Sequence, residues 1–190
     1  HAYEKESLID QIPNTLKNAA NLKIPKAPKA IAGEVSEVFL VPEIEALKAA
    51  DALLLSSKNY EVYLAPATEI PHILQEIGRQ RELTFRAIGE GTNKSVDLDE
   101  FDLYYQHLFL WDSEAHKIVG AYRMGLGAQI FEARGIDGFY LQDLFRFEPE
   151  LHEFMSQSIE MGRAYIVKEY QQKPMPLFLL WKGIIHTTLR

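Results

Sequence analysis

The sequence predicts an α+β domain in which a twisted central sheet is flanked by helices. Three observations lead to this prediction. A strand pattern is followed by a long helical pattern, two further strand patterns form a hairpin, and irregular helical segments then precede one more strand and a last helix. The 190 residues are 47% hydrophobic and 11% aromatic, which is enough to fill one core.

The first strand and the first long helix of this domain are expected after residue 59. Residues 60–64 combine aromatic and β-branched side chains, as strands do. Thr68 is a suitable N-cap for a helix over residues 69–88. Along that helix the apolar stripe is interrupted by Arg81, so a charge is expected on the buried face.

A hairpin is expected next, because residues 107–111 and 117–123 both have strand patterns and a polar turn joins them. Regular alternation along the second strand places Arg123 on the same face as Val119 and Ala121. Arg123 should therefore also point toward packed side chains.

The glycine-rich passage over residues 125–138 is expected to be a flexible loop. It lacks the third glycine of a dinucleotide fingerprint, because Ile130 stands at that place. The remaining elements are expected in this order: mixed segments over 139–158 that become mostly helical after residue 149, a strand over 163–168, a turn over 171–176, and a helix from residue 177.

The chain is predicted to divide near residue 58. Residues 1–58 are interpreted as an arm or linker with short helices, one of them over 42–50, and with an extended proline-lysine segment. Residues 59–190 form the predicted domain. Because its last residues stand inside an apparent helix without a C-cap, we expect this domain to be incomplete at its C-terminal end.

Composition and charge exclude several classes of function. A formal net charge of −7 and a pI near 5.4 argue against nucleic acid as a partner. The sequence has no Cys, which excludes disulfides and thiol nucleophiles and fits a reducing compartment. Neither a signal-peptide pattern nor a run of about 18 apolar residues is present. We therefore expect a cytoplasmic protein.

Charged residues stand where a core would normally exclude them, in four short blocks over residues 81–85, 97–102, 118–123 and 160–163. Buried charge is costly unless it is paired, and a functional site is a common reason for a chain to keep it. The alternative is an ion-pair network that only holds the glycine-rich passage in place. The sequence has no Cys and no His-Glu-x-x-His helix, so no metal is expected.

In their order and spacing, the four blocks resemble the GNAT N-acyltransferase superfamily. The resemblance covers residues 60–185 and is strongest to the hemolysin-like ornithine-lipid and glycine-lipid N-acyltransferases, a branch related to the acyl-homoserine lactone synthases. It implies an acyl-CoA N-acyltransferase-like fold and direct transfer of a fatty acyl group from a thioester to an amine, with no tightly bound cofactor. The absence of Cys, of a Gly-x-Ser-x-Gly elbow and of a His-Glu-x-x-His helix agrees with transfer that forms no acyl-enzyme.

The resemblance also implies roles for the charged residues. Carboxylates can hold an ammonium group and accept its proton, and arginine can bind a carboxylate with two parallel hydrogen bonds. Asp102 could instead pair with Arg81 or Arg123, and Glu160 could form an ion pair with Arg163. The predicted catalytic residues are Asp97, Asp99 and Glu160, and the predicted substrate-binding residues are Arg81, Asp102, Arg123 and Arg163.

The donor site is expected after the strand over residues 163–168. In the superfamily this turn is glycine-rich and offers backbone N–H groups to phosphates, whereas here it contains two prolines, which lack an N–H group. An acyl carrier protein is therefore favoured as donor, with coenzyme A as the alternative. The acidic surface of a carrier protein could meet Lys168, Lys173 or Lys182, although these lysines could equally be solvated surface. The predicted donor-binding residues are Tyr165, Val167, Lys168, Gln171 and Lys173.

The resemblance thus predicts acylation of an amino acid such as glycine or ornithine in the synthesis of aminolipids. The apolar run over residues 177–181 is a candidate wall for the acyl chain or a contact with the inner membrane surface. A noncatalytic module that binds a lipid or a carrier protein is the alternative. An autoinducer-synthase-like enzyme is the third reading, and it is disfavoured because residues 87–94 contain no aromatic residue.

Overall fold

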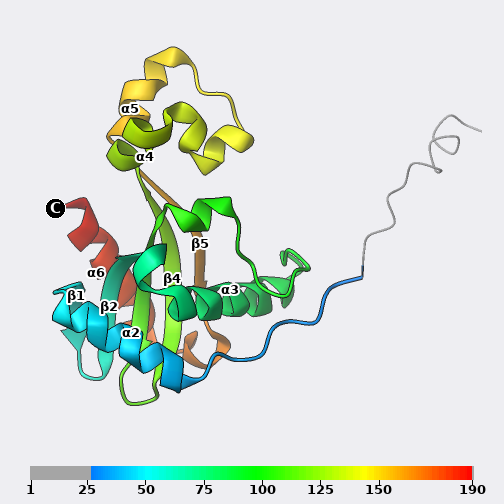
Figure 1. The fold of residues 1–190 in the computed structure, drawn as a ribbon, viewed down its shortest axis with the longest axis vertical. Helices are drawn as coiled ribbons and strands as arrows, with labels where there is room; N and C mark the ends of the chain where they lie inside the picture. Colours follow the sequence, from blue (N-terminus) through cyan, green and yellow to red (C-terminus); the bar gives the residue numbers. More distant parts are fainter. Residues whose placement is uncertain (1–26, 190) are drawn as a thin grey trace, which may run out of the picture.

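The computed structural model describes residues 27–189, which form a five-stranded antiparallel sheet in the order β1-β2-β3-β4-β5 (Figure 1). The strands are β1 (Leu53–Ser57), β2 (Tyr60–Pro66), β3 (Gln106–Asp112), β4 (Lys117–Leu126) and β5 (Ile159–Ile166). The α-helices are α2 (Glu37–Ala49), α3 (Pro71–Arg86), α4 (Gly127–Arg134), α5 (His152–Ser156) and α6 (Pro174–Thr188). The predicted α+β fold is confirmed.

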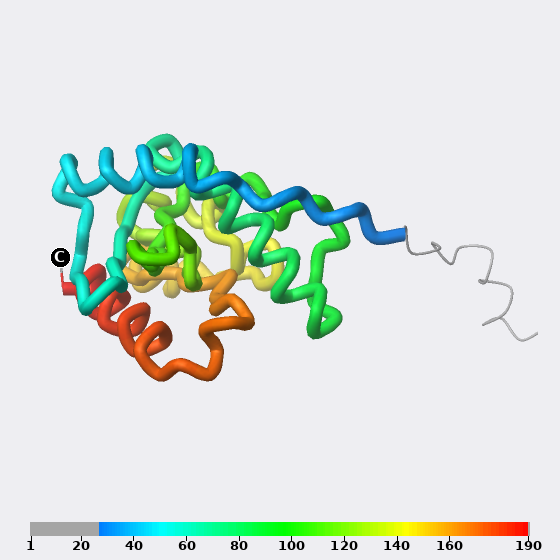
Figure 2. The backbone as a smooth tube through the Cα atoms, turned by 90° about the horizontal axis from the view of Figure 1, so that it is seen from below, coloured from blue at the N-terminus to red at the C-terminus, as the bar shows by residue number. Residues whose placement is uncertain are grey.

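Helices cover both faces of the sheet. Figure 2 shows α2 and α3 on one side and α6 on the other, which agrees with the two main apolar cores. The first core lies under α2 and α3 and contains Ile44, Ile73 and Phe109. The second lies under α6 and contains Val62, Leu108 and Leu180. Apolar residues thus fill both faces, and a charge on either face must find its partner within the protein.

The start of α3 is fixed differently from the prediction. Thr68 was expected as its N-cap, but it lies in a 3₁₀-helix (Ala67–Glu69), and α3 begins at Pro71 without a side-chain cap. Glu43 of α2 replaces the cap, because its carboxylate accepts hydrogen bonds from the backbone N–H groups of His72 (2.8 Å) and Ile73 (2.9 Å). A negative charge at a helix N-terminus is favourable, so this contact also joins α2 to α3.

The sheet and its first core extend to residues before the predicted division at residue 58. β1 pairs with β2, and Leu40, Ile44 and Leu47 of α2 are buried in the first core. The predicted helix over residues 42–50 begins five residues earlier, at Glu37, where Ser36 caps it. Residues 37–57 are therefore packed with the sheet, while the first part of the predicted arm, residues 1–26, lies outside the described residues.

A β-bulge changes which side chains of β4 face α3. The register with β3 shifts between Leu110 and Trp111, and Val119 belongs to the second core while Ala121 belongs to the first. The prediction that Val119 shares a face with Arg123 is therefore wrong, because an extra residue reverses the alternation. The prediction that Arg123 points into packed structure is confirmed, since its side chain is buried.

The glycine-rich passage is not the flexible loop that the sequence predicted. β4 continues to Leu126 and α4 follows at once. A Cβ atom at Gly127 would collide with the backbone carbonyl oxygens of Met155 and Ser158, so glycine here permits close packing. With the segments that follow, α4 and α5 form a lobe over one end of the sheet, which we call the α4–α5 lobe (residues 127–158; Figure 1).

The last strand also differs from its predicted range. β5 starts at Ile159, four residues before the predicted start, and Lys168 lies in a 3₁₀-helix (Lys168–Tyr170). β5 is bulged, since Arg123 of β4 pairs with Gly162 and Ala121 pairs with Tyr165. Arg163 within this bulge has a φ of 51°, a left-handed conformation that is uncommon for residues other than glycine. Among residues 27–189, no helix is both long and apolar enough to cross a membrane.

Candidate active site

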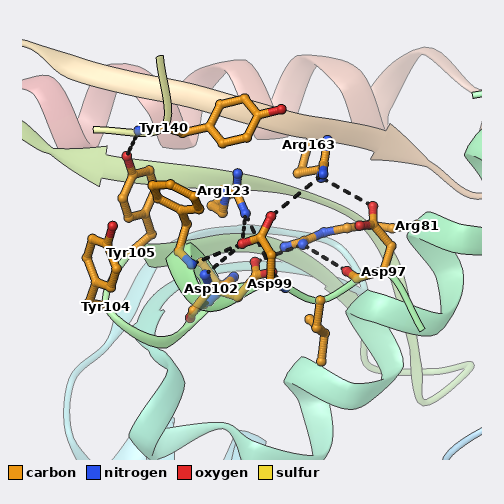
Figure 3. Close-up of polar contacts among 12 residues, drawn as sticks. Arg81, Asp97, Asp99, Asp102, Tyr104, Tyr105, Arg123, Tyr140 and Arg163 are labelled. Atoms are coloured by element: carbon orange, nitrogen blue, oxygen red, sulfur yellow. Dashed lines mark hydrogen bonds and ion pairs between the residues drawn. The ribbon is translucent and has the colours of Figure 1, made fainter. Parts of the chain in front are cut away.

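Three aspartates and three arginines meet between α3, the segment before β3, and strands β4 and β5 (Figure 3). We call them the Asp–Arg cluster: Arg81, Asp97, Asp99, Asp102, Arg123 and Arg163. The sequence predicted every one of them as a site residue, and the structure brings all six together. Their formal charges cancel, because three carboxylates face three guanidinium groups.

The pairs within the cluster are close. Arg81 Nη1 lies 2.8 Å from Asp102 Oδ1, and Arg123 Nη1 lies 2.6 Å from Asp99 Oδ1. Arg163 reaches two carboxylates, with Nε 3.3 Å from Asp97 Oδ2 and Nη2 3.6 Å from Asp99 Oδ2. The alternative that Asp102 pairs with Arg81 or Arg123 is confirmed for Arg81, and Arg123 Nη1 lies 3.5 Å from the second oxygen of Asp102.

Local hydrogen bonds shape the acidic segment. Asp99 caps a 3₁₀-helix (Glu100–Leu103) by accepting from the backbone N–H of Phe101 (3.0 Å), and Asp102 accepts from the backbone N–H of Asp99 (2.9 Å). This capping box fixes both carboxylates relative to each other. The segment is held against α3 because the Asp97 N–H donates to the Gly78 carbonyl over 2.9 Å.

Exposure separates the members of the cluster into two groups. Arg81, Asp97, Asp102 and Arg123 are almost completely buried. The side chains of Asp99 and Arg163 are 22% and 27% exposed. These two, one negative and one positive, are therefore the members that a ligand can reach from solvent.

Asp97 and Asp99 are neighbours with opposite pKa shifts. Burial raises the pKa of Asp97 above its ordinary value, although the charges of Arg163 and Arg81 oppose that shift. Burial would also raise the pKa of Asp99, but the hydrogen bond from Arg123 and the charges of Arg123 and Arg163 outweigh it, so that pKa is lowered. Two carboxylates with divergent pKa values can take different roles, the more basic one as proton acceptor and the other as a fixed negative charge.

Some buried polar atoms of the cluster make no hydrogen bond within the described residues. They are Arg81 Nε, Arg81 Nη2, Asp97 Oδ2 and Arg163 Nε, together with His107 Nδ1. Such atoms are rare in folded proteins and concentrate at sites. His107 donates from Nε2 to the Asp102 carbonyl (2.9 Å), and burial lowers its pKa to about 4. It is therefore neutral at pH 7.

Aromatic rings enclose the two arginines from the strands. The Arg123 guanidinium carbon lies 5.5 Å from the ring centre of Phe101, 5.4 Å from that of Tyr105 and 5.2 Å from that of Tyr140. Tyr140 also lies 5.8 Å from the Arg163 guanidinium carbon. These rings were not predicted as part of the site, because the aromatic residues near positions 101–105 and 139–140 have the sequence pattern of ordinary core.

Glu160 does not form the ion pair with Arg163 that the sequence suggested. Its Oε2 accepts from the Tyr105 hydroxyl (2.6 Å) and the Tyr140 N–H (3.1 Å), and its Oε1 accepts from the Leu141 N–H (2.9 Å). With both oxygens occupied and Arg163 turned toward the aspartates, Glu160 lies outside the cluster. It fastens residues 140–141 of the α4–α5 lobe to β5.

Four of the five predicted donor-binding residues line one cavity of about 850 Å³ between α3 and the segment after β5. They are Val167, Lys168, Gln171 and Lys173, and the opposite wall includes Arg79, Gln80 and Leu83 of α3. Tyr165 is not in the cavity wall. It is buried in the first core, where its hydroxyl donates to Gln80 Oε1 over 3.0 Å. Its position is behind the wall, because alternation along β5 turns it inward.

Comparison with known families agrees with this arrangement. Residues 80–181, just over half of the chain, match the acetyltransferase (GNAT) domain family. The chain belongs to the GNAT family. The matched range of this GNAT domain includes the whole Asp–Arg cluster and all of the predicted donor-binding residues. The family prediction made from the four charged blocks is confirmed.

Two curated relatives resemble this chain over about three fifths of its length. A glycine N(alpha)-acyltransferase of Bacteroides thetaiotaomicron is 36% identical over 123 residues, which is 62% of this chain and 36% of that protein. A protein of the same name from Phocaeicola vulgatus is 37% identical over 125 residues, which is 63% of this chain and 38% of that protein. The chain thus spans little more than a third of these relatives. No solved structure matches the chain.

Proposed function

We propose that this GNAT domain transfers a fatty acyl group from a thioester to the α-amine of an amino acid, with glycine as the first candidate and ornithine as the second. One observation carries the proposal. The two accessible members of the cluster have opposite charge, and Asp99 Oδ2 lies 3.6 Å from Arg163 Nη2. A zwitterionic amino acid carries the complementary pair of charges on adjacent groups. The names of the two relatives support glycine.

In this proposal the ammonium group of the acceptor binds Asp99, and its carboxylate binds the guanidinium of Arg163. The amine must lose a proton before it can attack. Asp97 is the more basic of the two carboxylates, because burial raises its pKa. Its side chain is almost completely buried, so it accepts the proton through an intervening water and not by direct contact. The nitrogen lone pair then attacks the thioester carbonyl carbon, and the C–S bond breaks. The sulfur leaves as a thiolate and takes the proton that the attacking nitrogen gives up as the amide forms, so no acyl-enzyme forms.

The donor occupies the cavity beside Val167. Lys168 and Lys173 lie at its wall, and α6 begins at Pro174 with a second proline at Pro176. Prolines at these places remove N–H groups that could otherwise bind a pyrophosphate. An acyl carrier protein is acidic on its surface and brings a single phosphate, so it suits this wall better than coenzyme A does. We propose acyl carrier protein as the donor and coenzyme A as the alternative.

We further propose that the product enters membrane lipids that contain an amino acid. The support is an apolar stripe on α6, where Phe178, Trp181 and Ile185 are exposed although the opposite side of the helix is buried on the sheet. Lys182 stands beside Phe178, with its ammonium nitrogen 5.8 Å from the ring centre. Apolar side chains next to lysines fit contact with an anionic membrane surface.

The test is acyl transfer by the full-length protein, followed by mass spectrometry with glycine or ornithine as acceptor and acyl carrier protein or coenzyme A as carrier. Asp99→Asn and Arg163→Gln should each lower kcat/KM by about 10²-fold or more while the protein stays folded. Lys48→Gln, on the surface of α2, is the matched control and should change nothing. If no acylated amine forms with any combination of acceptor and carrier, the noncatalytic module is favoured. Equal rates with both carriers would contradict the preference for acyl carrier protein.

A further inference from the structure

Tyr140 stands beside the accessible side of the Asp–Arg cluster, although neither the sequence nor the proposed mechanism gives it a role. It begins a 3₁₀-helix (Tyr140–Asp143) of the α4–α5 lobe, and its side chain is half-buried. Figure 3 shows its ring on the side of the cluster where Arg123 and Arg163 lie. The ring centre is 5.2 Å from the guanidinium carbon of Arg123 and 5.8 Å from that of Arg163.

Three contacts hold Tyr140 in place, two at its backbone N–H and one at its ring. The Tyr140 N–H donates to the Tyr105 hydroxyl (2.9 Å) and to Glu160 Oε2 (3.1 Å). On the side of the ring, Phe101 makes an edge-to-face contact with 5.3 Å between ring centres. Moving the ring aside would break its contact with Phe101 or the hydrogen bonds of its backbone, so the ring resists displacement.

We propose that the Tyr140 ring is the wall that limits the acceptor to amino acids with little or no side chain. The inference rests on the proposed function, in which the acceptor spans Asp99 and Arg163. Because the ring lies over the guanidinium of Arg163, an acceptor carboxylate bound there brings its α-carbon next to the ring. A larger substituent on that carbon meets a surface that cannot retreat. Discrimination by one methylene or methyl group in such a wall is typically about 10–200-fold.

Glu160 then acts as a positioning residue. Among the described residues it forms no hydrogen bond or ion pair with a member of the Asp–Arg cluster. Its carboxylate accepts hydrogen bonds from the N–H groups of Tyr140 and Leu141 and from the hydroxyl of Tyr105. Replacing it loosens the segment that carries the ring while leaving Asp99 and Arg163 in place. The selectivity for small acceptors should therefore weaken in Glu160→Gln as well, in the same direction as when the ring is removed.

The experiment compares kcat/KM for glycine, alanine and 2-aminobutyrate with one acyl donor, in the full-length protein and its variants. We expect Tyr140→Ala to raise the alanine-to-glycine ratio of kcat/KM by about 10-fold or more. Tyr140→Phe should keep the wild-type ratio, because the ring and not the hydroxyl forms the wall. Phe147→Ala is the matched control. The Phe147 ring packs, like that of Tyr140, against the buried cluster that contains Phe101 and Phe139, but it has no cation–π contact with Arg123 or Arg163.

A ratio within twofold of wild type in Tyr140→Ala overturns the inference, as does a wild-type enzyme that acylates alanine as well as glycine. Tyr140→Leu, which keeps part of the packing against Phe101, gives the same test if the alanine variant fails to fold. If the wild type acylates no amino acid, the proposed function fails separately. Calorimetric titration with glycine and alanine then tests the wall. Tighter binding of glycine that is lost in Tyr140→Ala supports the inference. Equal binding of the two amino acids, or no binding of either, overturns it.

Discussion

Arg123 Nη1 lies 2.6 Å from Asp99 Oδ1, although the side chain of the arginine is only 2% exposed and that of the aspartate is 22% exposed. The pair thus connects the interior of the sheet to the surface of the candidate site. Burial would lower the pKa of Arg123, but the hydrogen bond to Asp99 and the negative charges of Asp102 and Asp99 outweigh it, so the pKa is raised. Arg123 holds the carboxylate that is proposed to bind the acceptor and is itself beyond the reach of solvent.

Removing Arg123 should therefore strongly destabilise the protein. Arg123→Gln leaves Asp102 and Asp99 without their shared cation, and loss of one partner of a buried ion pair typically costs about 3–5 kcal/mol. Urea denaturation at pH 7 measures the change in the free energy of unfolding. Lys48→Gln, which removes exposed ion pairs with Glu45 and Glu61, should cost less than about 1 kcal/mol. A similar loss in the two variants would mean that the cluster is not the main ionic contribution to stability.

The two neutralising changes at Asp97 and Asp99 should affect stability in opposite directions at pH 7. The pKa of Asp97 is raised by folding, so its ionised form is disfavoured in the native state, and Asp97→Asn should leave the melting temperature unchanged or raise it. The pKa of Asp99 is lowered by folding, so its ionised form stabilises the native state above the unfolded pKa. Asp99→Asn should lower the melting temperature. Because Asp99 is partly exposed, the loss in the free energy of unfolding should be about 1 kcal/mol.

Calorimetric melting of both variants at pH 7, with acyl transfer measured on the same samples, checks this pair of predictions. Both variants should lose activity, because one loses the proton acceptor and the other the site for the ammonium group. An Asp97→Asn variant that melts well below Asp99→Asn would show that the pairing of Asp97 with Arg163 outweighs the cost of burying it.

The sequence was most informative where a periodic pattern was broken by a charge. Arg81 stands in the apolar stripe of α3, so its burial could be predicted. The first and last residues of α3 each lie within two residues of the expected limits. The acidic segment was recognisable because Asp97, Asp99 and Asp102 follow one another closely. Local patterns of this kind depend on neighbouring residues and are visible without a structure.

Features that depend on distant residues were not predictable. The bulge in β4 reverses the side of Val119, yet it arises from pairing with β3 and not from the local residues. The Glu160 carboxylate accepts hydrogen bonds from the N–H groups of Tyr140 and Leu141, which stand 20 and 19 residues before it. From the sequence alone, the nearby Arg163 was the expected partner. The glycines at the end of β4 suggested flexibility, whereas Gly127 permits close packing against the end of α5 and the residues that follow it.

His107 should make stability depend on pH in weak acid. Its pKa is about 4 in the native state because it is buried, against about 6.5 when exposed. The unfolded chain thus binds the proton first. Above about pH 6.5 the histidine is neutral in both states and the free energy of unfolding does not depend on it. As the pH falls from 6.5 toward 4, the free energy of unfolding drops by about 3 kcal/mol in all.

Urea denaturation at pH 7.5 and 4.5 should therefore show a smaller loss of stability in His107→Gln than in the wild type. Gln keeps a donor for the Asp102 carbonyl but does not titrate. His116→Gln is the matched control, because His116 is exposed and should leave the wild-type difference between the two pH values intact. Equal acid sensitivity in the wild type and His107→Gln would mean that other groups account for it.

Gly78 should control how closely the acidic segment approaches α3. A Cβ atom at this position would lie 2.6 Å from Leu98 Cγ and 2.9 Å from its Cδ2, so Gly78→Ala must displace Leu98. Leu98 stands between the two catalytic candidates Asp97 and Asp99, and the Asp97 N–H is bonded to the Gly78 carbonyl. Overpacking of this kind costs about 1–3 kcal/mol, which exceeds the gain of about 1 kcal/mol in helix propensity. The KM for the amino acid should rise as the carboxylates shift.

Leu98→Ala in the same chain should reverse both effects by removing the atoms that collide, which makes a double-mutant cycle the sharpest measurement. A coupling energy of about 1 kcal/mol or more between the two positions is expected, together with recovery of the acceptor KM. Gly33→Ala is the control, because a Cβ atom there has no neighbour within 4 Å among the described residues. Additive effects of Gly78→Ala and Leu98→Ala would mean that the acidic segment keeps its position independently of α3.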